Sequence, residues 1–66
     1  MNCEEIKNNI EKMGYKVLCF GIIYMAVKED TQKLAVKIYN YNGWNRAKVY
    51  LSLFKGIKEF EGANKR

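Results

Sequence analysis

The middle of the chain reads YKVLCFGIIYMAVKEDTQKLAVKIY from Tyr15 to Tyr39, and this stretch decides the fold. Its β-branched and aromatic residues favour one strand over Tyr15–Phe20 and a second over residues 22–27. Gly21 stands between them and permits the positive φ angle that a tight reversal needs. The two segments are therefore expected to form a β-hairpin.

A polar segment and a third strand complete this central region. Residues 28–33 read KEDTQK and predict a turn. Apolar Leu34, Val36 and Ile38 then alternate with Ala35, Lys37 and Tyr39, which is the period of a strand. Two short connections predict an antiparallel meander with the second strand in the centre.

The region before the hairpin carries the signals of an amphipathic helix. Asn2 can cap the first turn, and Glu5 stands at the position from which a carboxylate reaches back to the cap. Gly14 ends the pattern. One face of this helix is apolar and comprises Cys3, Ile6, Ile10 and Met13.

A second helix is predicted from Arg46 to about Phe60, after Asn42-Gly43 ends the strand and Asn45 supplies a cap. Its apolar residues span an arc of about 220°, where a surface helix needs about 100°. Gly56 inside the helix either permits close approach by another element or is tolerated by chance. Residues 62–66 are predicted to be a solvated tail.

The predicted fold is a two-layer α+β sandwich of residues 1–61, in the order helix, three-stranded antiparallel meander, helix (αβββα). We expect both helices to pack on one face of the sheet. That face is predicted to carry Ile23, Met25, Val27, Leu34, Val36 and Ile38. The opposite face then carries Ile22, Tyr24, Ala26, Lys28, Lys33, Ala35, Lys37 and Tyr39, with either Tyr15, Val17 and Cys19 or Lys16, Leu18 and Phe20.

The composition argues against an enzyme. The 66 residues include no His, one Ser, one Thr and one Asp, so Ser-His-Asp and Cys-His catalysis and an imidazole metal site are absent from the inventory. We predict no catalytic residue, no metal and no cofactor. Cys3 and Cys19 are expected to be reduced core residues of a cytoplasmic protein, because no signal peptide precedes them. The longest apolar run, residues 17–27, is too short for a membrane span of about 20 residues.

The charge favours binding to an acidic partner. Twelve Lys and Arg against seven Asp and Glu give a formal charge of +5. Charge of this size also serves solubility alone. Aromatic rings and cations on the sheet face predicted to point away from the helices are typical of a protein interface or of a surface on which nucleic-acid bases stack. The same residues are also ordinary for a half-exposed strand. The predicted partner-binding residues are Tyr24, Lys37, Tyr39, Tyr41, Trp44 and Arg46.

The order helix, three strands, helix resembles that of the double-stranded RNA-binding domain. This resemblance implies phosphate contacts at the start of the second helix, where Arg46 and Lys48 match the basic positions of that family. The family's loop between its first two strands is reduced here to Gly21. The basic residues and this resemblance make direct nucleic-acid binding the alternative function. Its predicted contacts are Lys28, Lys33, Lys37, Arg46 and Lys48.

The first third of the chain also resembles small phage-encoded anti-CRISPR inhibitors of Cas9. The residues that carry this resemblance are Met1, Asn2, Glu5, Ile6, Ile10, Tyr15, Val17 and Gly21. It implies an inhibitor of similar size and element order. The acidic, DNA-mimicking surface of that family has no counterpart in this sequence, so none of its functional residues is transferred.

These patterns lead to one functional hypothesis and one assembly hypothesis. We expect a non-enzymatic phage or mobile-element accessory protein that binds and inhibits a host protein or nucleoprotein complex, with an anti-CRISPR as the concrete case. We also expect a homodimer, because the wide apolar arc of the second helix and the open sheet face exceed what one short chain hides. The dimer interface is either the sheet face or the helix flank of Val49, Leu53 and Phe60.

Overall fold

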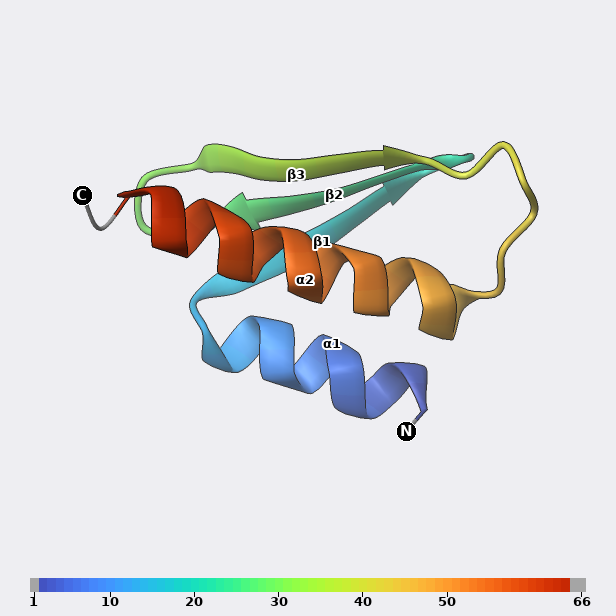
Figure 1. The fold of residues 1–66 in the computed structure, drawn as a ribbon, viewed down its shortest axis with the longest axis horizontal. Coiled ribbons are helices and arrows are strands. Elements are labelled where there is room, and N and C mark those ends of the chain that lie inside the picture. The colour runs from blue at the N-terminus through green and yellow to red at the C-terminus, as the bar shows by residue number, and fades with distance from the viewer. Residues whose placement is uncertain (1, 65–66) are drawn as a thin grey trace.

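Two helices cover one face of a three-stranded sheet in the computed structural model, which describes residues 2–64 (Figure 1). The predicted αβββα order is confirmed. The elements are α1 (Cys3–Lys12), β1 (Tyr15–Phe20), β2 (Ile23–Lys28), β3 (Lys33–Tyr39) and α2 (Arg46–Asn64).

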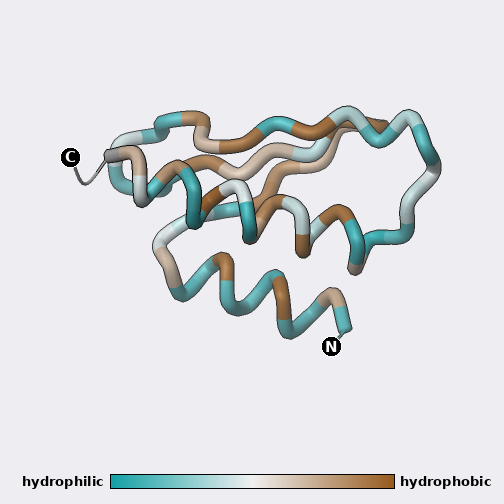
Figure 2. Tube along the Cα trace, viewed as in Figure 1, coloured by the Kyte–Doolittle hydropathy of each residue, from teal (hydrophilic) through white to brown (hydrophobic). Residues whose placement is uncertain are grey.

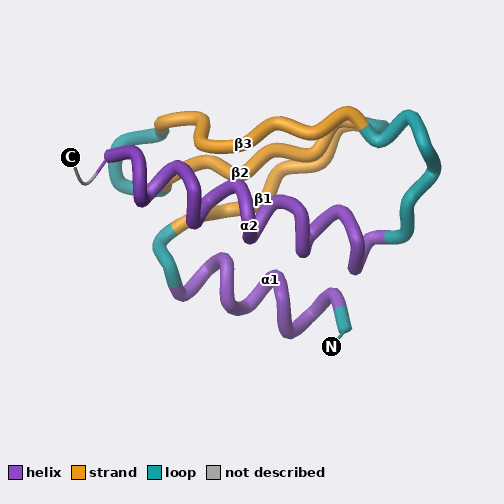
Figure 3. The backbone as a smooth tube through the Cα atoms, viewed as in Figure 1, coloured by secondary structure: helices purple, strands orange, loops and turns teal. Residues whose placement is uncertain are grey.

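The strands form an antiparallel meander in the order β1-β2-β3, so β2 is central as predicted. Gly21 adopts φ 61° in the tight turn between β1 and β2. In the second turn the backbone N–H of Gln32 donates to the carbonyl of Lys28 at 2.8 Å. A longer loop, drawn in teal in Figure 3, leads from β3 to α2 and brings the chain back across the sheet.

Helix α1 begins and ends as the sequence predicts. The side-chain oxygen of Asn2 accepts a hydrogen bond from the backbone N–H of Glu5 at 2.9 Å. The helix buries Ile6 and Ile10 against the rest of the protein. Gly14 follows with φ 90°, a conformation that favours glycine, and its carbonyl accepts from the N–H of Glu29 at 2.9 Å. This bond ties the start of β1 to the end of β2.

Helix α2 is longer than predicted and more completely covered. It starts at a cap in which Asn45 accepts from the N–H of Lys48 at 2.9 Å, and it extends to Asn64. Residues 62–64 of the predicted tail are therefore helical, while 65–66 lie outside the described residues. The helix contacts α1, β2 and β3 together. Most of its wide apolar arc is therefore buried against α1 and the sheet of the same chain.

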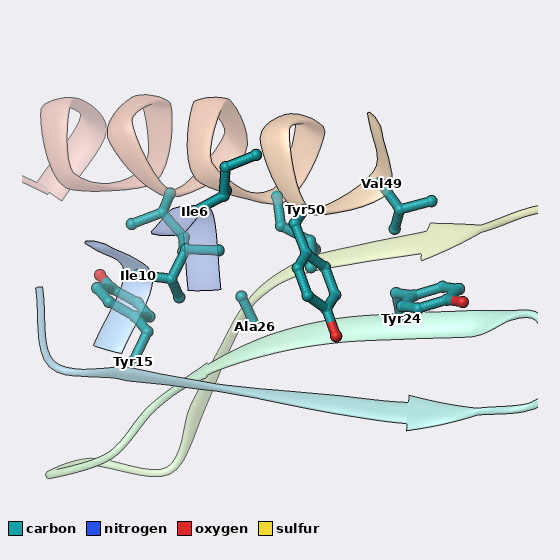
Figure 4. Packing of buried hydrophobic residues seen from close by; sticks show 9 residues of the cluster. Ile6, Ile10, Tyr15, Tyr24, Ala26, Val49 and Tyr50 are labelled. Carbon is teal, nitrogen blue, oxygen red and sulfur yellow. The ribbon is translucent and has the colours of Figure 1, made fainter. Parts of the chain in front are cut away.

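The prediction that Val49 and Leu53 are exposed on a flank of α2 is wrong for the same reason. Val49 and Leu53 are fully buried core residues, and Phe60 is half-buried with its ring 6.4 Å from that of Tyr15. Figure 4 shows Val49 pointing from α2 toward the sheet. A second chain could not reach Val49 or Leu53 without opening the core, so these two residues are not available to a partner.

The predicted orientation of β2 is also wrong. Tyr24 and Ala26 face the helices, and Tyr24 packs edge to face on Tyr50 with ring centroids 6.3 Å apart (Figure 4). Ile23 and Met25 therefore point to the opposite face. Successive residues of β2 are mostly apolar, as the brown and tan colours of this strand in Figure 2 show. The hydrophobic pattern therefore did not determine which face the helices cover.

A β-bulge in β3 explains why Lys33 and Leu34 lie on the opposite faces from those predicted. Ala26 pairs with Val36 and Val27 pairs with Leu34, which leaves Ala35 as the extra residue. Val36 and Ile38 pack against the core as predicted, whereas Leu34 turns to the opposite face and is exposed. The bulge thus changes the inside–outside phase within one strand.

The structure resolves the two interpretations of Gly56. A Cβ atom placed there would lie 2.7 Å from Cγ2 of Val36 and 2.9 Å from its Cγ1. Non-bonded carbon atoms prefer separations of about 3.5–4.0 Å. Glycine at this position therefore lets α2 approach β3 closely.

Tyr15 joins the sheet to the end of α2 and gives a prediction for alkaline pH. Its hydroxyl donates to Glu61, whose carboxylate lies 3.7 Å from Nζ of Lys28. Burial, followed by the hydrogen bond and the charge of Glu61 and by the charge of Asp30, raises the pKa of Tyr15 from 10.0 to about 12. The folded state thus holds the phenol proton more tightly than the unfolded chain. Its contribution is complete below pH 10 and is lost as the pH rises through about 12.

We therefore expect Tyr15→Phe to remove part of the alkaline loss of stability between pH 10 and 12, the window set by this pKa shift. The variant should also lower stability at pH 7 by about 1 kcal/mol, because the bond to Glu61 is gone. Urea unfolding followed by circular dichroism at a series of pH values measures both effects. The exposed Tyr41→Phe is the control and should keep the wild-type profile. Identical alkaline profiles for wild type and Tyr15→Phe would contradict the prediction.

Candidate binding surface

The sheet face opposite the helices is the main exposed apolar surface of the described chain. Strand register places its side chains in three rows across the sheet. We call this surface the open face; its rows are Lys16, Val27 and Leu34, then Leu18, Met25 and Lys37, then Phe20, Ile23 and Tyr39. Both helices lie on the other side of the sheet, so no helix or strand within residues 2–64 covers these side chains (Figure 1).

The exposure of the open face is large for apolar residues. Phe20 is 61% exposed, Leu34 48% and Tyr39 45%. The other apolar members are half-buried by their neighbours, except Val27, which is buried. A contiguous exposed apolar surface of this kind is typical of an interaction site.

Charge on the open face has one sign. The central column from β2 is wholly apolar, and each edge strand contributes one cation, Lys16 from β1 and Lys37 from β3. No Asp or Glu occurs in the three rows. The acidic residues lie instead on α1, in the β2–β3 turn and near the end of α2. The open face therefore has no anion of its own to pair with its lysines.

One corner of the open face gathers rings and a cation. The Tyr39 and Tyr41 rings stack with centroids 5.9 Å apart and an interplanar angle of 8°, and Nζ of Lys37 lies 5.2 Å from the Tyr39 centroid. We call Lys37, Tyr39 and Tyr41 the ring cluster.

The loop that follows the ring cluster is fastened by reciprocal hydrogen bonds. The side chain of Asn40 accepts from the N–H of Trp44 at 2.9 Å and donates to its carbonyl at 3.0 Å. Nζ of Lys48 lies 4.4 Å from the centroid of the Trp44 ring, which is half-buried. These contacts hold the loop that carries Tyr41 in a defined shape.

The predicted partner-binding residues separate into two groups. Lys37, Tyr39 and Tyr41 come together in the ring cluster, and Arg46 is exposed at the start of α2. Tyr24, predicted to be exposed, is buried on the helix side. A hydrogen bond with Cys19, followed by burial, raises the pKa of Tyr24. Trp44 packs against the core and presents only part of its ring.

The predicted nucleic-acid contacts do not form one patch. Lys33, Lys37, Arg46 and Lys48 are exposed, but Lys28 lies on the helix side of the sheet beside Glu61. The register places Lys33 on that same side, opposite to Lys37. The sequence also contains an uneven distribution of charge that the predictions did not include. Between Thr31 and Lys58 there are six Lys and Arg and no Asp or Glu. This stretch comprises β3, the following loop and most of α2.

Several open-face residues were not assigned by the sequence. Lys16, Leu18 and Phe20 formed one of the two alternatives for the first strand, and Leu34 was placed in the core. Cys19, expected in the core, is exposed, because burial falls along β1 from Tyr15 to Phe20. Lys16 could have decided between the two alternatives, because lysine side chains are rarely buried. The residues that alternate with the same phase as Lys16 should therefore face away from the core.

The described residues offer little else for a site. No pocket and no group of three or more potential metal ligands occurs in this part of the chain. No helix within residues 2–64 has the length and apolar character needed to span a bilayer. No family model, curated protein or solved structure matches this chain. The open face and the ring cluster are therefore the candidate binding surface.

Proposed function

We propose that this protein is a non-enzymatic binding module that holds a partner protein on the open face of its sheet. The observation that carries the proposal is a contiguous apolar surface with Phe20, Leu34 and Tyr39 exposed and with helices only on the opposite side. Covering such a surface removes apolar area from water, at about 25 cal/mol per Å². The rigid sheet adds little ordering cost on binding.

The chemistry of the central column favours a protein over a nucleic acid. Ile23, Met25 and Val27 are aliphatic or thioether side chains, and they occupy the middle of the surface. Sheets that bind single strands present rings on which bases stack. Here the rings are confined to one end, at Phe20 and the ring cluster. An aliphatic centre is better matched by the apolar side chains of a protein.

The most concrete form of this proposal is an inhibitor of a host protein or nucleoprotein complex. The resemblance to anti-CRISPR proteins supports an inhibitory role, and the absence of carboxylates on the open face argues against DNA mimicry as the means. The direct test is DNA cleavage by a Cas9–guide RNA complex with increasing amounts of the protein. Unchanged cleavage at a large molar excess would remove this form of the proposal and leave the docking surface to be tested separately.

A lysine in place of Phe20 is expected to weaken partner binding at least tenfold, because a charge replaces the most exposed apolar side chain of the open face. Tagged wild type and variants are expressed in a bacterial host, and the proteins that co-purify are quantified by mass spectrometry. The matched control is Leu51→Lys, at a position on α2 that is 40% exposed and remote from the open face. A partner recovered equally with both variants would contradict docking on the open face.

A second candidate function is direct nucleic-acid binding, favoured by the cation-rich stretch from Thr31 to Lys58 and by the ring cluster. If Lys33, Arg46 and Lys48 neutralise phosphates, log K should fall with log salt with a slope of about −0.7 per contact for single strands and −0.9 for duplexes. Fluorescence anisotropy with labelled oligonucleotides between about 50 and 200 mM salt measures this slope. Affinity that does not depend on salt would reject the candidate.

A further inference from the structure

The open face has the charge pattern of a docking site for an acidic amphipathic helix. We infer that the partner segment seated on it is a helix with an apolar stripe and carboxylates on both flanks of that stripe. This inference rests on the proposed function and names the chemistry of the partner. It follows from where the cations of the open face stand relative to its apolar centre.

The apolar column of β2 runs between two edge strands that each carry one lysine. Lys16 lies in the row of Val27, and Lys37 lies in the next row, beside Met25. A segment laid along β2 therefore meets apolar side chains beneath it and one cation on each side. Because the open face has no carboxylate, the partner must supply the anions that pair with these lysines.

The dimensions of the face fit one helix. Neighbouring strands are about 4.8 Å apart, so β1 and β3 are separated by about 10 Å. A helix with its side chains is about 10–12 Å across. The two lysines are one row apart along the strands, which is about 7 Å. In a helix with apolar positions a and d, position g and the following e lie on opposite flanks, five residues and about 7.5 Å apart.

A second copy of this chain is a poorer occupant by the same criterion. Stacking two open faces would place Lys16 and Lys37 of both copies in one interface with no Asp or Glu among the facing rows. Like charges held at an interface are unfavourable. The other homodimer surface, on α2, is occupied by the core of the protein. An acidic helix pairs these lysines and also covers the apolar column.

The test is a selection from a displayed library of three-heptad helices. Positions a and d vary among Leu, Ile, Met and Phe, and positions e and g vary among Glu, Gln and Lys. We expect selection on the wild-type protein to enrich Glu at e and g. A selected peptide, synthesised with a fluorescent label, should bind at least tenfold more weakly to the double variant Lys16→Glu/Lys37→Glu. The same peptide with Lys at e and g should bind that variant better than it binds wild type.

Two further variants separate failure of this inference from failure of the proposed function. If Phe20→Lys abolishes binding of the selected peptide, Leu51→Lys preserves it and the charge reversal has no effect, docking on the open face stands and the acidic partner is overturned. If Phe20→Lys leaves peptide binding unchanged, the open face is not the site and both are overturned. Both positions are exposed in the wild type, so we expect these variants to fold, which circular dichroism checks.

Four other outcomes also overturn the acidic helix. One is enrichment of Lys or Gln at the flanking positions, and another is a library that yields no binder. The third is a sedimentation mass of twice 7.8 kDa that Phe20→Lys returns to the monomer value, which assigns the open face to a second copy. A single-stranded RNA that displaces the selected peptide from wild type, but does not bind Phe20→Lys, assigns the face to nucleic acid.

Discussion

Glutamate in place of Leu53 is expected to unfold the protein. Leu53 is fully buried in the core, on a helix that contacts α1 and the sheet. Removing most of such a side chain costs about 2–5 kcal/mol, and burying a carboxylate without a partner adds to this loss. A domain of 66 residues has a total stability of about 3–10 kcal/mol. The helical circular dichroism signal and the cooperative urea transition should therefore both be lost.

The same change two residues earlier provides the control. Leu51 lies on α2 and is 40% exposed, so Leu51→Glu should change stability by less than about 0.5 kcal/mol and keep the urea transition. The pair separates a core role from an interface role for this part of α2. A folded, monomeric Leu53→Glu protein that replaced a wild-type dimer would contradict the core assignment and restore the helix flank as an interface.

Alanine at Gly56 is expected to destabilise the protein although it improves the helix. Alanine gains up to about 1 kcal/mol over glycine inside a helix. Its Cβ, however, would stand 2.7 Å from Cγ2 of Val36, and overpacking costs about 1–3 kcal/mol. The valine side chain is branched at Cβ and has few rotamers to escape into. We expect a net loss of about 1 kcal/mol in urea unfolding.

The sign of this effect should reverse when Val36 is shortened. In a Val36→Ala background the two methyl groups nearest to Gly56 are gone. Gly56→Ala should then raise stability, because only the helix preference remains. A double-mutant cycle measures the coupling between the two positions. Gly56→Ala that is equally destabilising in both backgrounds would show that the close contact with Val36 is not the cause.

Local signals made most of the fold predictable from sequence. Asn2 and Asn45 cap their helices, Gly14 and Gly21 adopt the positive φ angles expected of them, and the short connections produce a meander. Each of these features depends on residues within a few positions of one another. Only the end of α2 was placed short, because residues 61–64 continue the helix beyond the last large apolar residue.

The inside and the outside of the sheet required information from tertiary structure. Both alternations of β2 are apolar, with Tyr24 and Ala26 on one side and Ile23 and Met25 on the other. The helices settle on the side where Ala26 is small and Tyr24 meets Tyr50. The bulge at Ala35 then reverses the phase of β3. Neither effect has a signature in hydrophobic periodicity.

The candidate site was predictable only in part for the same reasons. Lys37 and Tyr39 stand two residues apart on one strand and so share a face whichever phase is chosen, and Tyr41 stacks on Tyr39. Tyr24 was assigned to the surface because the phase of β2 was not determined by its sequence, and Val49 and Leu53 because the contacts of α2 with both α1 and the sheet were underestimated. With these contacts known, the exposed apolar surface lies on the open face and not on this flank of α2.

The position of α2 in the chain has a consequence for folding. Helix α2 is the last of the described elements to be made, yet it contacts α1, β2 and β3. Until Leu53 and Ile57 are available, the strands have no completed core to pack against, and both apolar faces of β2 remain exposed. A chain that ends before α2 is therefore expected to leave both faces of β2 uncovered and to aggregate. Such a chain would expose two apolar sheet surfaces where the finished protein exposes one.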